Sequence, residues 1–195
     1  MIDMEEFIRQ VGQVKARMDN GMCREGPRLD KGSRTEALLT GSASRCVGLA
    51  DAVVQLCRQD HPNEALPILR HLADAVTAMA WVLASAEPEA RAAEVLEELG
   101  RSCAGQSWPP ETLRERARLA GLPASELEDI LSAGREFPHA GRAALPWSHV
   151  YADNQHRGLD SAAVLRLTVR WMARALKAMD SRWPGSFSGG DELLT

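Results

Sequence analysis

The chain has 195 residues and a formal net charge of −4, and 45% of its residues are hydrophobic. This length suits one domain with a substantial core, and the acidic balance argues against coating nucleic acid by bulk electrostatics while leaving room for a local basic patch. No uninterrupted apolar run approaches the roughly 20 residues that span a bilayer, and the acidic start does not resemble a signal peptide. We therefore expect a soluble cytoplasmic protein with no membrane contact.

Apolar residues recur at helical spacing from end to end, and no alternating strand pattern is sustained. Asn20 and Gly21 are expected to end the first helix, and the next residues, through 34, indicate a long loop. Residues 137–147 contain too much proline and glycine for regular structure. The spacing and the turn signals predict helices over residues 2–19, 35–60, 63–86, 88–102, 111–119, 126–136 and 160–182.

These elements predict an all-α fold. We expect an up-and-down bundle of about four long helices, with short helices inserted between the third and the fourth. The bundle is predicted to form a single domain over residues 1–182. Residues 183–195 are predicted to be a flexible C-terminal tail that could be trimmed without affecting the fold.

The helix predicted over residues 63–86 is apolar almost all round, which is typical of a helix at the centre of a bundle. It leaves only a narrow polar strip, formed by Arg70, Asp74, Thr77 and Trp81. Arg70 and Asp74 are four residues apart and can pair in a partly buried place, where they either hold the bundle together or line a site. An arginine in such a place can also clamp phosphate or carboxylate, and His71 beside it can titrate near neutrality.

A second polar concentration covers residues 148–157. If this segment is helical, His149, Asp153 and His156 share one face, and Tyr151 and Asn154 lie near another edge. Such a face could place a histidine for proton transfer or bind a ligand, or it could be a solvated surface turn. Several close carboxylates are missing, so we predict no metal site and no cofactor.

The residues that surround each tryptophan and cysteine indicate whether it belongs to the core. Trp81 and Trp171 stand in apolar helical patterns and are expected in the core, whereas the tryptophans beside prolines could line a pocket. The pocket-lining candidates are Trp108, Trp147 and Trp183. The cysteines show no zinc-ligand spacing, and Cys46 and Cys57 are expected to pack as small hydrophobic residues.

The central helix, followed by a later cluster of tyrosine, serine and histidine, resembles a bacterial family of uncharacterised helical proteins related to the HEPN superfamily. In that family a leucine-rich helix carries an arginine followed four residues later by an acid, here Arg70 and Asp74. A later histidine is preceded by tyrosine and serine, here His156 with Tyr151 and Ser148. The resemblance spans roughly residues 35–179 and implies an all-α fold.

Many HEPN proteins are metal-independent ribonucleases that join an arginine and a histidine, separated by four to six residues, across a dimer. Here Arg142 and His149 have six residues between them, although Pro146 interrupts a continuous helix. The resemblance therefore implies RNA or a nucleotide as a partner and a homodimer as the assembly.

Three classes of function follow. The first is a HEPN-like module acting on RNA or a nucleotide, as a metal-independent ribonuclease or a degenerate relative. The second is a small-molecule enzyme or binding protein that uses a pocket inside the bundle, with histidine, aspartate or tyrosine as acid or base. The third is a non-catalytic interaction protein.

We favour the first class, because only the resemblance to a family points to one of the three functions over the others. The candidate catalytic residues are Asp74, Arg142, His149 and His156, and the candidate substrate-binding residues are Arg70, His71, Trp147, Tyr151, Asp153 and Asn154.

Overall fold

The computed structural model describes residues 4–101, 108–134 and 159–194. These residues form seven α-helices and two short 3₁₀ helices and contain no strand, which confirms the all-α prediction. The α-helices are α1 (Met4–Glu25), α2 (Arg34–Arg58), α3 (Pro62–Leu83), α4 (Pro88–Arg101), α5 (Pro110–Leu119), α6 (Ala124–Gly134) and α7 (Ser161–Arg182), and the 3₁₀ helices are η1 (Gly26–Arg28) and η4 (Asp191–Leu193).

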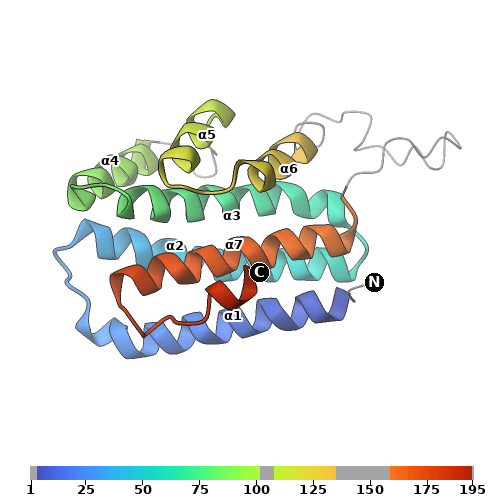
Figure 1. Cartoon of the computed structure of the whole chain (residues 1–195), viewed down its shortest axis with the longest axis horizontal. Coiled ribbons are helices and arrows are strands. Elements are labelled where there is room, and N and C mark those ends of the chain that lie inside the picture. Colours follow the sequence, from blue (N-terminus) through green and yellow to red (C-terminus); the bar gives the residue numbers. More distant parts are fainter. Residues whose placement is uncertain (1–3, 102–107, 135–158, 195) are drawn as a thin grey trace, which may run out of the picture.

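Of the four longest helices, α1, α2 and α3 pack around the fourth, α7. Helix α3 also packs against α2 along its length, and the shorter helices α4, α5 and α6 contact α3 from the other side. Figure 1 shows the resulting layers, with α1 at the bottom, α2 and α7 above it, then α3, and the short helices on top. Helix α3 is therefore enclosed between the long helices and the short ones.

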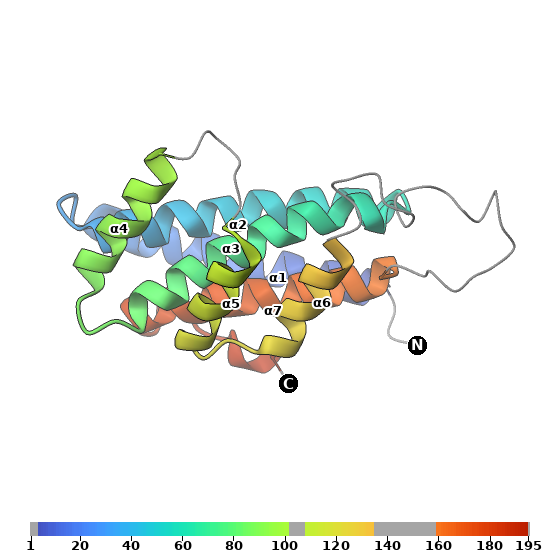
Figure 2. The ribbon, with the colours of Figure 1, turned by 90° about the horizontal axis from the view of Figure 1, so that it is seen from above.

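The chain direction does not alternate through all four long helices. In Figure 1, α2 runs opposite to α1 and α3, whereas α7 runs in the same direction as α3. Helices α4, α5 and α6 carry the chain back along the bundle before α7 begins, as Figure 2 shows from above. The predicted up-and-down order thus holds from α1 to α3 and ends there.

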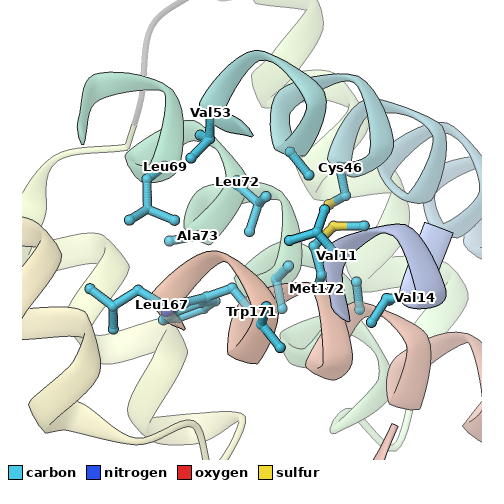
Figure 3. Close-up of a cluster of buried hydrophobic side chains, with 14 of the residues drawn as sticks. Val11, Val14, Cys46, Val53, Leu69, Leu72, Ala73, Leu167, Trp171 and Met172 are labelled. Atoms are coloured by element: carbon cyan, nitrogen blue, oxygen red, sulfur yellow. The ribbon is translucent and has the colours of Figure 1, made fainter. Parts of the chain in front are cut away.

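The core is built mainly from aliphatic and sulfur-containing side chains at helical spacing, with a few aromatic rings among them. Trp171 of α7 is fully buried and Trp81 of α3 is 7% exposed, which confirms the core positions predicted for both. Burial raises the pKa of the Cys46 thiol to about 12 and that of Cys57 to about 11, so both are protonated core residues at neutral pH. Figure 3 shows part of this core, where α1, α2, α3 and α7 contribute Val11, Val14, Cys46, Val53, Leu69, Leu72, Ala73, Leu167, Trp171 and Met172.

By length and composition alone, α2 and α3 would be long and apolar enough to cross a membrane. Buried core helices of soluble proteins pass the same test. In the most apolar 18-residue window of α3, 56% of the residues are buried inside the protein. The apolar character of α3 is thus accounted for by its packing against α2 and α7.

The segment after α7 packs onto the bundle, although the sequence predicted a loose tail. We call residues 183–194 the C-terminal clasp. Phe187 of the clasp is 1% exposed and belongs to the main core. Ser186 Oγ donates a hydrogen bond of 2.6 Å to the carboxylate of Glu25 at the end of α1. The clasp therefore joins the ends of α1 and α7.

Two further sets of contacts hold the clasp. The carboxylate of Asp180 on α7 accepts hydrogen bonds from the backbone amides of Gly185 and Phe187, at 2.9 and 3.1 Å. The guanidinium of Arg17 on α1 donates to the carbonyl of Gly189. The composition of the clasp, rich in glycine and serine, hid these contacts. The bonds to Arg17 and Glu25 join residues far apart in the sequence, and the bonds to Asp180 depend on how the chain turns after α7.

Helix α1 continues through Gly21 to Glu25, so the predicted stop at Asn20 and Gly21 is wrong. Gly21 is buried, and a Cβ atom there would overlap the ring of Phe187. The glycine thus provides room for the clasp to approach the helix rather than a signal to end it.

We predict that Gly21→Ala destabilises the protein by about 1–3 kcal/mol, because the added methyl group displaces Phe187 from its position. Gly12→Ala is the matched control, since Gly12 lies on the same helix with open space around its Cβ direction. There alanine should stabilise by up to about 1 kcal/mol through helix propensity. Urea unfolding measures both, and a stabilising Gly21→Ala would contradict the packing described for the clasp.

The start of α2 is capped by a carboxylate from α4. Ser33 is the N-cap residue. Its hydroxyl donates a hydrogen bond of 2.5 Å to the carboxylate of Glu89 and accepts one from the backbone amide of Glu36. Glu89 also accepts from the backbone amides of Arg34 and Thr35, at 2.9 and 3.2 Å. These bonds, with the Ser33 hydroxyl first among them, lower the pKa of Glu89 from 4.5 to about 2. An acid on a helix N-terminus is also favoured by the helix dipole.

We predict that Glu89 makes folding sensitive to acid. Because its pKa is lower in the folded chain, its contribution to stability is fully present above pH 4.5 and is lost as the pH falls towards 2. In Glu89→Gln the free energy of unfolding, measured in urea across this range, should depend less steeply on pH. Glu87→Gln removes the same charge nearby, and an equal effect in this control would argue against the cap.

Candidate functional site

The polar strip of α3 faces the short helices. Arg70 Nε donates a hydrogen bond of 3.2 Å to Asp74 Oδ1, and both side chains are only 15% exposed. The sequence predicted from their spacing that these two residues pair in a partly buried place, and this is confirmed. Since a partly desolvated charge is costly, the pair requires further partners.

His71 lies beside the same carboxylate. Its Nδ1 is 4.0 Å from Asp74 Oδ2, and its side chain is 30% exposed. Asp74 is thus placed between the guanidinium of Arg70 on one oxygen and the imidazole of His71 on the other. We call these three residues the α3 group. Of the three, His71 is the side chain that solvent reaches most readily.

Arg70 has a second partner across the bundle. Its Nη2 donates a hydrogen bond of 2.7 Å to the backbone carbonyl of Trp108, just before α5. Trp108 belongs to the part of the chain that connects α4 to α5. Arg70 therefore fixes the path of the chain into α5, which is a structural role; its role in chemistry stays a prediction.

The ring of Trp108 continues into a stack of alternating aromatic rings and arginines. The guanidinium of Arg116 on α5 lies 4.1 Å from the ring centroid of Trp81 and 4.2 Å from that of Trp108. Arg91 on α4 lies 4.5 Å from the Trp81 ring. Each contact is of the cation–π kind, which is strengthened where water is excluded, and Arg116 is 7% exposed.

Glu98 of α4 balances the charge of this stack. Its two carboxylate oxygens accept hydrogen bonds of 2.8 Å each from Arg116, in the bidentate geometry that suits arginine. The indole Nε1 of Trp108 donates to the same carboxylate at 3.1 Å. The strip of α3 is therefore used to attach α4 and α5. Sequence reasoning missed Arg116 and Glu98, because neither belongs to a recognisable motif.

Most candidate site residues lie outside the described residues. These are Arg142, Trp147, His149, Tyr151, Asp153, Asn154 and His156, and Ser148 from the family resemblance falls with them. The helices that flank this segment, α6 and α7, end and begin at the end of the bundle where α3 begins (Figure 1). The convergence of the two clusters stays a prediction.

Within residues 4–101, 108–134 and 159–194, no group of three or more histidine, cysteine, aspartate or glutamate side chains could hold a metal ion. The chemistry offered by the α3 group is instead acid–base and electrostatic. A carboxylate beside an imidazole can orient the ring for proton transfer.

Comparison with known proteins gives no match to any family model, curated protein or solved structure. The resemblance to HEPN-related proteins is therefore a hypothesis carried by the residues named above.

We predict that Arg70→Ala destabilises the protein by about 2 kcal/mol, because it removes the bond to Trp108 and leaves Asp74 without its guanidinium. Arg9→Ala serves as the control: Arg9 pairs with Glu6 on the surface of α1, with its side chain 58% exposed. Exposed pairs add little, so the control should unfold almost as the wild type does. Equal urea midpoints for both variants would show that the Trp108 contact does not stabilise the fold.

Proposed function

We propose that this protein is a HEPN-related helical-bundle protein of the bacterial cytoplasm that acts on RNA or a nucleotide, with the α3 group as part of its site. The proposal includes a homodimer as the working assembly. The observation that carries it is the position of Asp74 between Arg70 and His71 on one helix. This arrangement agrees with the arginine-then-acid pattern on which the family resemblance depends.

The roles follow from the contacts. Arg70 is held by Trp108 and Asp74, so it fixes the carboxylate in place. Asp74 in turn orients the imidazole of His71, whose partly exposed ring is available for proton transfer. This assignment gives His71 the acid–base role, where the sequence suggested a binding role, and it gives Asp74 a positioning role.

For RNA, the proposed reaction needs no metal. A histidine accepts the proton of a ribose 2′-hydroxyl while that oxygen attacks the adjacent phosphorus, and the 5′-oxygen of the next nucleotide leaves with a proton from a second group. The products are a 2′,3′-cyclic phosphate and a 5′-hydroxyl end. We propose His149 or His156 as the second group, with Arg142 next to the phosphate.

The test is cleavage of fluorescently labelled single-stranded RNA by the full chain in the presence of EDTA, with the ends of the products identified. His71→Ala should reduce the rate by about 100-fold, which is typical for loss of an acid–base group. His61→Ala is the matched control, because His61 is the N-cap residue of α3, its side chain is 55% exposed, and its Nδ1 lies 4.0 Å from Glu64 Oε2. It should cleave as the wild type does.

Three results would contradict parts of the proposal. Equal activity of His71→Ala and the wild type would remove the α3 group from the site, and unchanged activity of His149→Ala and His156→Ala would remove the second cluster. Absence of both RNA cleavage and binding of nucleoside phosphates would overturn the proposal and favour a non-catalytic interaction protein. Light scattering on the purified chain tests the homodimer.

A further inference from the structure

A cavity of about 550 Å³ lies at the C-terminal end of α3, whereas the α3 group occupies the middle of that helix. It is bounded by the last turn of α3, the turn between α5 and α6, the second half of α7 and the end of the clasp. Its volume falls within the range of pockets that hold small molecules. The lining residues are Ala80, Leu83, Ala84, Ala120, Gly121, Leu122, Pro123, Arg174, Lys177, Ala178, Ser181 and Leu194.

The cavity has an apolar floor and a polar rim. Ala178 is buried, and Ala80 and Leu83 are partly buried, so these small and aliphatic side chains form the inner surface. Lys177 and Ser181 are exposed and follow one another along the same face of α7, at the mouth. A ligand with an apolar body and one polar end would match this cavity.

The charges that line the cavity have one sign. Arg174 and Lys177 are its charged lining residues, and no acidic side chain is among the described residues that line it. Arg174 is 13% exposed and is committed to Glu126 of α6 at 2.7 Å. Lys177 pairs with Asp191 of η4 at 2.7 Å, but these side chains are 58% and 77% exposed. Such an exposed pair is weak, so the ammonium group can exchange Asp191 for another anion.

We propose that this cavity binds a small amphipathic carboxylate, with its hydrocarbon part on the floor between α3 and α7 and its carboxylate on Lys177. Binding replaces the Lys177–Asp191 pair by a pair between Lys177 and the ligand. Asp191 therefore acts as an internal competitor for the lysine. Leu194, at the end of the clasp, lies over the hydrocarbon part.

This site is independent of the proposed reaction. Ala80 and Arg70 are ten residues apart on α3, so they are separated by about 15 Å along the helix axis. The residues that form the cavity take no part in the α3 group. Failure of either proposal leaves the other one standing.

The probe is octanoate, titrated into the full chain by calorimetry, with octylammonium as a probe of the same length and opposite charge. Octanoate should bind saturably and more tightly than octylammonium. Lys177→Met should weaken octanoate binding about fivefold, the effect of one exposed ion pair. Asp191→Asn should tighten it, because the lysine loses its internal competitor.

Lys15→Met is the matched control, since Lys15 is also a lysine paired with an aspartate, Asp51, but lies on α1 away from the cavity. It should bind octanoate as the wild type does. The opposite signs expected for Lys177→Met and Asp191→Asn distinguish a binding role from loss of folding, and circular dichroism verifies that each variant is folded. No saturable binding, equal binding of the two probes, or equal effects of Lys177→Met and Lys15→Met would each overturn the proposal.

Discussion

Burial of α3 is the constraint on which the rest of the structure depends. This helix has so little polar surface that it cannot face water on any broad side, and most of its apolar residues are fully buried. Helices α2 and α7 cover one side, and the short helices α4, α5 and α6 cover the other. The return of the chain over α3 also explains why α7 runs parallel to it rather than antiparallel.

The same burial determines how the polar strip of α3 is used. A guanidinium that is removed from water must be paired and hydrogen-bonded, and Arg70 meets this need with Asp74 and the Trp108 carbonyl. Arg116 meets it with Glu98 and with the tryptophan rings on either side. These contacts give the short helices a specific register on α3, which apolar packing alone defines less sharply. The strip is thus a structural connection, and His71 lies beside it with its side chain 30% exposed.

The middle and the C-terminal end of α3 present different chemistry. In the middle, the carboxylate of Asp74 lies 4.0 Å from the imidazole of His71, and the proposed proton transfer depends on this contact. Near its end, small side chains leave a cavity whose mouth carries Lys177. Because α3 is rigid and enclosed, it holds both places in fixed positions relative to the core. A ligand in the cavity would contact the clasp, which in turn is attached to α1 and α7.

By itself, the sequence determined the all-α class, the approximate bounds of the helices, the central place of α3 and the Arg70–Asp74 pair. These follow from local periodicity and spacing, which a helix expresses wherever it is placed. Only the tertiary structure decided that Gly21 lies inside a helix, that Phe187 fills the space above it, and that Arg70 reaches Trp108. A glycine-rich segment looks the same in sequence whether it is loose or packed, because the partner that orders it is distant along the chain. In the candidate site, the bond between Arg70 and Trp108 has the same origin, since it joins residues that no local pattern connects, whereas the contacts of Asp74 with Arg70 and His71 follow from helical spacing.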